Sequence, residues 1–360
     1  MNLSEIAHYR LVSQQIATTK LTTAVEMVAW LGGVQAQEYT QTKWGIGVRL
    51  PHLKDIDIES NLTEGKILRT HLLRPTWHFV TAEDIRWMLK LTAPRVQSAN
   101  AFMYRKLELQ SKLFTRCNDL LIKLLEGNKQ LTRTAINEEF KKQNILANGL
   151  RLSYIMMQAE LDSIICSGAK QGNQFTYALL DERVPSFRAK HHDEALAELA
   201  TRYFGSRGPA TIKDFSTWSG LTMTDCRRGI SMLSAALEKV RADNREFYCS
   251  SAVLSCNEQF QGIGLLPVYD EFIMSYKDRI ALFIWRDAIN PKPAFKNDST
   301  IVFQVQIIGT WKRTINKNSI DLHVDFFSPM QQGKNNALKK AIERFEEFYA
   351  LPVMCLPEMV

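Results

Sequence analysis

The residues whose types and spacing best suit chemistry are two glutamines separated by one alanine, Gln35 and Gln37. Each amide side chain offers two donors and one acceptor, so a pair of them can hold a water molecule without being ionised. Side chains at i and i+2 share a face only where the chain is extended or turning. The preceding Gly32 and Gly33 allow such a turn. The spacing alone equally suits two solvated glutamines at a helix end.

The sequence lacks the common catalytic signatures. It contains no GxxxxGK[ST] phosphate loop, no HExxH or HxE…PCxxC zinc motif and no GxSxG nucleophile elbow. The seven histidines include one adjacent pair, His191 and His192, and the six cysteines form no CxxC pair. We therefore expect no metal and no cofactor, and we expect reduced, mostly buried thiols.

The composition is that of an ordinary globular protein. Hydrophobic residues make up 45% and charged residues 23% of the 360 residues, which is enough for several cores. No apolar run reaches the roughly 18 residues of a membrane span, and the N-terminus has no apolar segment of a secretory signal. We expect a cytoplasmic protein that does not enter a membrane.

The positive charge is concentrated in one segment. The net charge is +7, and the segment from Asp84 to Arg151 holds 13 Lys/Arg against 6 Asp/Glu, an excess equal to that of the whole chain. A basic segment is typical of proteins that bind polyanions. A solvated helical surface explains the same charge, so the partner is not decided by charge alone.

Helices followed by a small β-ribbon recur along the chain. In the first unit an apolar helical pattern at 23–35 leads into the glutamine pair, and a polar-faced helix is expected at 57–67. Residues 67–80 then predict two short strands that turn at Arg74. A threonine followed by acids at 81–84 begins the next helix.

Two further units repeat this order, and three helices followed by a hairpin form a winged helix-turn-helix. The second unit predicts helices at 118–125, 131–140 and 152–163, then strands at 164–168 and 174–179 around a polar tip at 170–173. The third predicts helices at 194–204, 212–219 and 224–237, then a strand, loop and strand at 240–250.

The last region is rich in β-structure. Strand patterns cover 300–311 and 319–327, with 301–307 alternating as one half-buried strand, and a helix follows at 335–350. We therefore predict a mainly α fold with small β elements: three tandem winged-helix units and a C-terminal β-rich region. The predicted divisions are 1–89 (first unit), 90–113 (helical connector), 114–190 (second unit), 191–255 (third unit) and 256–360 (C-terminal region).

Several motifs in a fixed order resemble the winged-helix DNA glycosylases of the AlkZ type, which excise alkylated bases and unhook interstrand crosslinks. They are VQAQEY (34–39), W-x-x-x-x-RL (44–50), ILRTHLLRPTWHFV (67–80), QFTYALLDERVP (174–185), LLPVYDEFIMSYKDR (265–279) and IIGTWKR (307–313). The resemblance implies a C-shaped clamp around DNA. Pro75 replaces the glycine expected in the turn of the ribbon, which puts that loop's approach to DNA in doubt.

The resemblance assigns the glutamine pair its role: Gln35 and Gln37 position the hydrolytic water. A purine alkylated at N7 or N3 is cationic and leaves as a neutral base, so no protein acid is needed for its departure. What remains is to place water under an oxocarbenium-like sugar, which amide oxygens can do by positioning. We expect a monofunctional DNA glycosylase, a hydrolase of DNA repair that needs no lysine nucleophile.

Cationic and polar residues of the units are candidates for DNA contact, and such contacts would depend on salt. The DNA-binding candidates are Arg69, His71, Arg74, His78, Lys170, Arg227 and Arg228. For the ribbon residues the alternatives are strand surface and a core histidine. Asp270 is expected near the cleft or in an ion pair with Arg279.

The expected partner is double-stranded DNA, alkylated or crosslinked, bound by a monomer. A non-catalytic winged-helix DNA-binding protein, such as a transcription regulator, is the alternative. Three winged helices in one chain weigh against it, because a simple repressor has one such unit and dimerises to read half-sites. A protein that uses its winged helices for protein contacts is a third possibility.

Overall fold

A computed structural model describes residues 1–185, 189–233, 236–256, 258, 260–279, 298–329 and 334–357. Together they form a mixed structure of helices and small sheets. The first part of the chain contains α1 (Leu3–Ser13), α2 (Ala24–Leu31), β1 (Val34–Gln35), α3 (Tyr39–Arg49), α4 (Asp55–Thr63), β2 (Ile67–Leu72), β3 (Thr76–Thr81) and α5 (Ile85–Lys106).

The predicted helix at 23–35 is shorter than expected. Thr23 caps the N-terminus of α2 with a capping box completed by Glu26, and Gly32 ends the helix with φ +63°. The chain then becomes extended, so Gln35 lies in strand β1 and not on a helix. The two strands predicted at 67–80 are confirmed as β2 and β3.

The second part follows the predicted order closely. It contains α6 (Ser111–Leu125), β4 (Leu131–Thr132), α7 (Arg133–Lys142), α8 (Leu150–Leu161), β5 (Ile165–Ser167), β6 (Thr176–Leu179) and α9 (Leu180–Arg183). Thr132 caps α7 by accepting a hydrogen bond from the backbone N–H of Ala135. The strands β5 and β6 form the predicted hairpin.

The third part contains α10 (His192–Arg207), α11 (Ile212–Ser219), α12 (Met223–Ser231), β7 (Leu237–Ala242), β8 (Arg245–Ser250) and α13 (Ser251–Leu254). The helix predicted at 224–237 is wrong in its second half, because α12 ends at Ser231 and Leu237 begins a strand. Residues 234 and 235 of that prediction lie outside the described residues.

The last part contains β9 (Ile263–Leu266), α14 (Glu271–Met274), β10 (Ser299–Phe303), β11 (Gln306–Ile315), β12 (Ile320–Phe326), α15 (Lys334–Tyr349) and β13 (Val353–Pro357). These strands form one sheet in the order β13-β12-β11-β10-β9. The single strand predicted at 301–307 is wrong, because the chain turns at Gln304 (φ +54°) and β10 and β11 pair as a hairpin.

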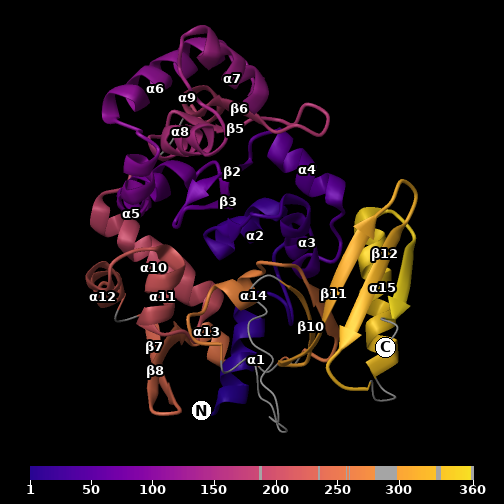
Figure 1. Cartoon of the computed structure of the whole chain (residues 1–360). Helices are drawn as coiled ribbons and strands as arrows, with labels where there is room; N and C mark the ends of the chain where they lie inside the picture. The colour runs from indigo at the N-terminus through magenta and orange to yellow at the C-terminus, as the bar shows by residue number, and fades with distance from the viewer. Residues whose placement is uncertain are drawn as a thin grey trace.

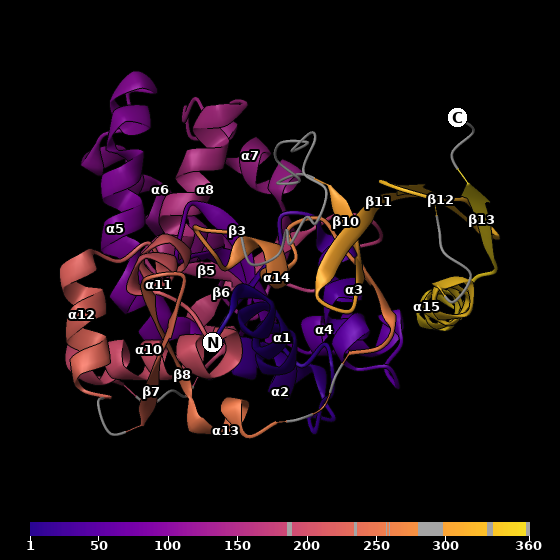
Figure 2. The same cartoon turned by 90° about the horizontal axis from the view of Figure 1, so that it is seen from below.

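Three large cores hold these parts together. The second part has its own core between α6, α7 and α8, and it lies at the top of Figure 1. A second core joins α2 and α3 to the five-stranded sheet and α15, at the right of both views (Figures 1 and 2). The third joins β2, β3 and α5 to α10, α11 and α12. The small sheet β1-β3-β2 therefore lies where these three cores meet.

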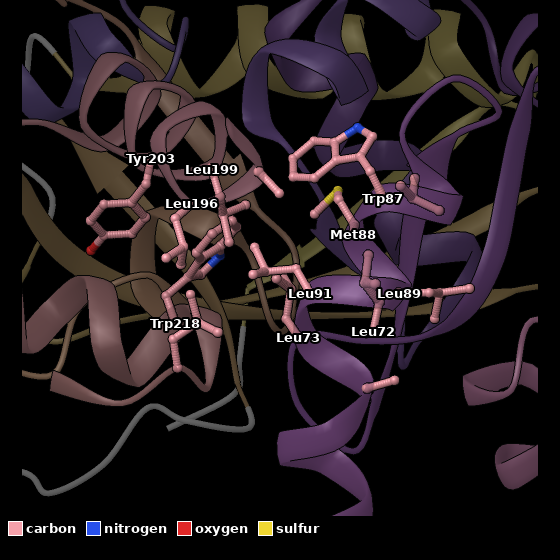
Figure 3. Close-up of a cluster of buried hydrophobic side chains, with 14 of the residues drawn as sticks. Leu72, Leu73, Trp87, Met88, Leu89, Leu91, Leu196, Leu199, Tyr203 and Trp218 are labelled. Atoms are coloured by element: carbon pink, nitrogen blue, oxygen red, sulfur yellow. The ribbon is translucent and has the colours of Figure 1, made fainter. Parts of the chain in front are cut away.

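The core shared by the first and third parts is built from large side chains. Leu72 and Leu73 of the ribbon, with residues of α5, face Leu196 and Leu199 of α10 and Trp218 of α11 (Figure 3). All five are nearly or fully buried. Burying each such side chain stabilises the fold by about 1.5–3 kcal/mol, so this contact holds the ribbon in a fixed place on α10 and α11.

Two expectations concern the whole chain. Within the described ranges, no helix combines the length and apolar character that crossing a bilayer requires. All six cysteines are free thiols, of which Cys117, Cys166, Cys226 and Cys249 are buried. Burial raises the pKa of the Cys117 thiol to about 11 and that of Cys166 to about 12, so both are protonated and unreactive at neutral pH.

Candidate active site

A short edge strand positions the glutamine pair. Gly33 has φ +146°, a conformation that side-chain-bearing residues rarely adopt, and it turns the chain from α2 into β1. Gln35 pairs with His78 in antiparallel register, and the N–H of Ala36 donates to the carbonyl of Trp77 at 2.7 Å. Gln35 is 4% exposed whereas Gln37 is exposed. A solvated helix end is therefore the wrong interpretation for Gln35.

Gln35 is held through both its backbone and its side chain. Its N–H donates to Glu271 Oε1 at 2.8 Å, and its carbonyl accepts from the Thr42 hydroxyl at 3.1 Å. Its side-chain oxygen accepts from Arg74 Nη2 at 3.0 Å. A guanidinium can only donate, so this contact fixes the amide with its oxygen toward Arg74. The amide of Gln35 is therefore oriented before any substrate binds.

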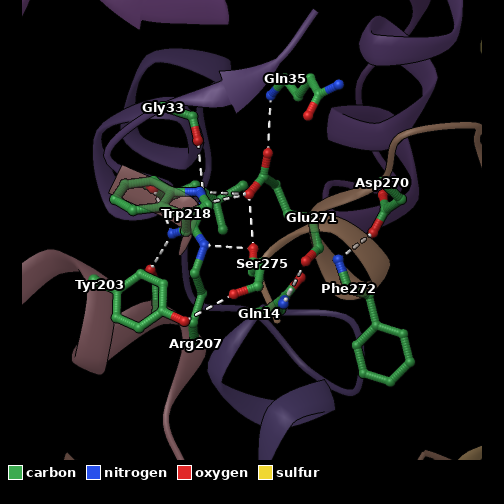
Figure 4. A network of polar contacts seen from close by, with 12 residues as sticks. Gln14, Gly33, Gln35, Tyr203, Arg207, Trp218, Asp270, Glu271, Phe272 and Ser275 are labelled. Carbon is green, nitrogen blue, oxygen red and sulfur yellow. Dashed lines mark hydrogen bonds and ion pairs between the residues drawn. The ribbon is translucent and has the colours of Figure 1, made fainter. Parts of the chain in front are cut away.

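Glu271 links the strand to the third part of the chain. Its other carboxylate oxygen accepts from Arg207 at 2.7 Å, from the indole N–H of Trp218 at 3.0 Å and from the Ser275 hydroxyl at 2.8 Å (Figure 4). Burial alone would raise the pKa of Glu271, but the Arg207 charge and these hydrogen bonds lower it to about 2. The carboxylate is therefore ionised and fully paired.

A second buried ion pair supports the same region. Arg49 of α3 makes a two-point contact with Asp270, at 2.8 and 2.9 Å, and both side chains are buried. The expected pairing of Asp270 with Arg279 is wrong, because Arg279 donates to the carbonyl of Ile273 instead. Asp270 and Glu271 therefore act as neighbouring anchors, one for α3 and one for β1.

Two unpaired polar groups share the sheet face of Gln35. His78 pairs with both Gln35 and Thr70 across the three strands, so the three side chains project from the same face. His78 Nδ1 contacts the carbonyl of Thr76 at 2.9 Å and must carry the proton. Within the described residues, His78 Nε2 and Thr70 Oγ1 are buried without a hydrogen-bond partner. Buried polar groups without partners mark places where water or a ligand binds.

The burial of His78 argues against its predicted contact with phosphate. The side chain is 0% exposed, and burial together with the Arg74 charge lowers its pKa to about 3. At neutral pH the ring is uncharged, and Nε2 is a hydrogen-bond acceptor. Such an atom can accept a hydrogen bond from a water molecule but cannot bind an anion.

His71 and Arg69 project from the opposite sheet face. His71 Nδ1 lies 2.5 Å from the buried carboxylate of Glu160 in α8. The centroid of the His71 ring lies 4.0 Å from that of Trp77. This arrangement suits the core-histidine alternative and argues against a phosphate contact. The Arg69 Nε–H donates to the carbonyl of Ala36 at 3.1 Å, and its guanidinium lies 4.4 Å from the Trp77 ring.

The remaining candidates lie on different surfaces. Lys170 of the β5–β6 tip lies 5.3 Å from the ring of Tyr39, beside Arg69 and the glutamine strand. Arg227 and Arg228 are exposed on α12, and Arg228 is paired with Asp193 at 2.6 Å. Helix α12 packs on α10 and α11 and lies at the left edge of both views, apart from the sheet (Figures 1 and 2).

The sequence singled out the segment of Gln35 and Gln37 but not the distant residues that hold it. Glu271, Arg207 and Glu160 were not candidates. Glu271 and Glu160 contact Gln35 and His71 from distant parts of the chain, and Arg207 pairs with Glu271. Glu271 stands in the motif at 265–279, but the sequence does not show that it faces Gln35, 236 positions away. Among the described residues, no group of three His, Cys, Asp or Glu side chains is arranged to hold a metal ion.

Comparisons with known proteins agree with this architecture. The solved structure of DNA glycosylase AlkZ from Streptomyces sahachiroi superposes with a TM-score of 0.79 at 17% identity, over 99% of this chain and 100% of that chain. An interstrand DNA cross-link repair glycosylase from the same organism is 20% identical over 325 residues, 86% of this chain and 87% of the relative. The family model described as DNA glycosylase AlkZ-like matches residues 28–348. This match spans most of the chain, so the protein belongs to the AlkZ-like DNA glycosylases, a family of hydrolases that act on N-glycosyl bonds in DNA.

Proposed function

We propose that the chain is a monofunctional glycosylase that hydrolyses the N-glycosidic bond of purines alkylated at N7 or N3, with Gln35 and Gln37 positioning the water. One observation carries this proposal. The side-chain oxygen of Gln35 is fixed by Arg74 on a sheet face that also presents the unpaired acceptor of His78 and the hydroxyl of Thr70. Such polar groups, aligned in advance, are what a hydrolytic water needs.

The chemistry needs little beyond this placement. An alkylated purine carries a positive charge and departs as a neutral base, so the difficult part is to deliver water to an electron-poor sugar. Gln37 is exposed and free to complete the water's second contact once DNA is bound. Lys43, the lysine of α3, is ion-paired with Asp55 and Glu59 at 2.8 and 2.6 Å. That pairing supports hydrolysis by water over attack by an amine.

The DNA-binding surface is proposed from the repeated helix-and-hairpin order. We propose that the regions 1–89, 114–190 and 191–255 are tandem winged-helix units and, with the connector 90–113 and the region 256–360, form a C-shaped clamp. Arg69 and Lys170 would bind phosphates near the glutamines, and Arg227 and Arg228 would bind farther along the duplex. One chain then encloses the duplex, so the protein is proposed to act as a monomer.

Crosslinked DNA is proposed as a second substrate. The relative from Streptomyces sahachiroi is named for interstrand cross-link repair, and this chain covers most of its length. An interstrand crosslink made through N7 of guanine carries the same activating charge as a simple alkylated base. The same water and the same glutamines would therefore serve both lesions.

The test is base release from defined DNA. Wild type is incubated with a duplex that contains one 7-methylguanine and, separately, with a duplex crosslinked by a nitrogen mustard. We expect release and unhooking, each slowed at least about tenfold by Gln35→Ala and by Gln37→Ala, with Gln15→Ala, a substitution at the end of α1, as the control. Release that is unchanged in both variants contradicts the site. Absence of release from every lesion, with footprinting on one sequence, supports a regulator instead.

A further inference from the structure

A pocket lies behind the glutamine strand, between the β2–β3 ribbon and the β5–β6 hairpin. Its volume is about 340 Å³, within the range of small-molecule sites. Its lining includes Arg69, Trp77, Arg133, Ser167 and Phe175. The ribbon and the hairpin are joined at its base, where the N–H of Arg69 donates to the Ser167 hydroxyl at 2.8 Å.

Two arginines give the pocket a positive charge, and Glu160 and Glu38 act on Arg69 only from a distance, without a direct ion pair among the described residues. Within the described residues, neither Arg69 nor Arg133 lies within 4.0 Å of a carboxylate oxygen of Asp or Glu. Among the described residues, the Arg69 guanidinium donates only through Nε, to the carbonyl of Ala36, and the Arg133 guanidinium only through Nη2, to the Ser153 hydroxyl at 2.7 Å. Both guanidinium groups therefore keep donors for an anion.

Aromatic rings form the walls beside this charge. The Arg69 guanidinium lies between Trp77 at 4.4 Å and Phe175 at 4.7 Å. Phe175 is 39% exposed, which is unusual for so large an apolar side chain, and Lys170 lies 5.8 Å from its ring. Aromatic rings next to cations are the arrangement that binds nucleotides, because the base stacks while its phosphate is neutralised.

The pocket is not the place where the glycosidic bond is cut. Arg69 and Trp77 project from the sheet face opposite Gln35 and His78, since neighbouring strand residues point to opposite faces. The pocket is nevertheless tied to the active strand, because Arg69 holds the carbonyl of Ala36, the residue between the two glutamines. Its occupant is therefore near the lesion but is not the base that leaves.

We infer that this pocket binds one undamaged nucleotide of the DNA substrate, with the base against Phe175 and the phosphate on Arg69 and Arg133. The inference rests on the proposed function, and it adds a binding site to it. A nucleotide held here contacts the Arg69 guanidinium. The same guanidinium donates to the backbone carbonyl between Gln35 and Gln37. The pocket therefore adds DNA affinity next to the active strand.

The first test uses small probes with the full chain. Deoxyadenosine monophosphate, deoxyadenosine and inorganic phosphate are titrated separately and followed by Trp fluorescence, with Trp77→Phe to identify the responding indole. We expect the nucleotide to bind most tightly, and Arg133→Gln and Phe175→Ala to weaken it about tenfold each. Arg95→Gln, on the exposed face of α5, is the matched control and should have no effect. Equal affinity for phosphate and nucleotide overturns the base-stacking part of the inference.

The second test separates this inference from the proposed function. In single-turnover release of 7-methylguanine, Arg133→Gln and Phe175→Ala should raise the protein concentration needed for half-maximal rate about tenfold and leave the maximal rate unchanged. If wild type binds the nucleotide but releases no base, the pocket stands and the proposed function falls. If base is released normally and neither variant changes the half-maximal concentration, the pocket inference is overturned. Circular dichroism spectra of both variants confirm folding, since both positions are partly exposed.

Discussion

The two faces of the sheet β1-β3-β2 differ in how their charges are satisfied. On the Gln35 side, Arg207 is paired with Glu271, Arg49 is paired with Asp270, His78 is neutral, and Arg74 donates to Gln35 without a carboxylate partner among the described residues. On the opposite side Arg69 keeps donors that no carboxylate uses among the described residues, and Lys170 lies nearby over an aromatic ring.

We infer from this difference that the Gln35 face positions the reacting groups and that the opposite face binds DNA. Under the proposed function, groups that must not move during hydrolysis are held mainly by buried ion pairs, which cost no reorganisation during the reaction. Groups that must receive a polyanion keep their charge unpaired until DNA supplies the phosphates. The strand β1 belongs to both sides, so positioning and binding lie next to each other at one short segment.

The largest effect is expected from breaking the paired side. Glu271→Ala leaves the buried Arg207 without its carboxylate and removes the acceptor for the N–H of Gln35. We expect the free energy of unfolding to fall by about 3–5 kcal/mol, measured by urea denaturation. The control is Arg228→Gln, which breaks an exposed ion pair and should cost less than about 1 kcal/mol. Equal losses in the two variants would contradict the proposed role of Glu271.

The next effect concerns the orientation of the amide. Arg74→Gln removes the donor that faces the side-chain oxygen of Gln35. We expect the maximal rate of base release to fall about tenfold, with little change in DNA affinity, because the amide is then free to rotate. Arg95→Gln, a change on the exposed face of α5, is the control. A large loss of affinity at an unchanged rate would show that Arg74 binds DNA instead.

The neutral state of His78 predicts a pH dependence of stability. Its pKa is lowered to about 3 in the fold, from 6.5 in an unfolded chain, so the unfolded state binds the extra proton between these values. Stability is therefore complete above about pH 6.5 and falls as the pH is lowered, by up to about 1.4 kcal/mol per pH unit.

Between pH 7 and pH 5 Glu271 contributes nothing, because it acts only below its ordinary value of 4.5, whereas His8, whose pKa is also lowered by burial, contributes equally to wild type and to a His78 variant. His78→Asn should flatten the pH dependence of the unfolding free energy in that window, whereas His192→Asn, an exposed position, should leave it unchanged. An identical slope in wild type and His78→Asn would mean that His78 is protonated in the fold.

The smallest effect is expected at the distant helix. Arg227→Gln on α12 should weaken DNA binding slightly and equally for damaged and undamaged duplexes, and lower the salt dependence by about one phosphate contact. Fluorescence anisotropy at several salt concentrations measures both quantities. A selective loss for damaged DNA would place α12 next to the lesion, which the packing of α12 on α10 and α11 argues against.

The local parts of this architecture follow from the sequence. The ribbon at β2 and β3 and the β5–β6 hairpin depend on residues close together in the chain, and their patterns predict them. Strand β1 does not follow, because two residues carry no periodicity and their partner His78 lies 43 positions away. An apolar helical pattern therefore extended the predicted helix too far.

The supports of the site could not be predicted for the same reason. Histidine is a polar residue type that is common at protein surfaces. Only the fold shows that Glu160, 89 positions away, lies against His71. The split of 301–307 into two strands depends on one residue, Gln304, that turns with positive φ. The resemblance to a known family supplied the role of Gln35 and Gln37, which spacing alone left open.

Single-turnover release of 7-methylguanine by Gln35→Ala and Arg133→Gln, measured side by side over a range of protein concentrations, tests the division between the two faces most directly. The division predicts that Gln35→Ala lowers the maximal rate at an unchanged half-maximal concentration, and that Arg133→Gln does the reverse. If both variants change the same quantity, the two faces of the sheet do not divide positioning from binding.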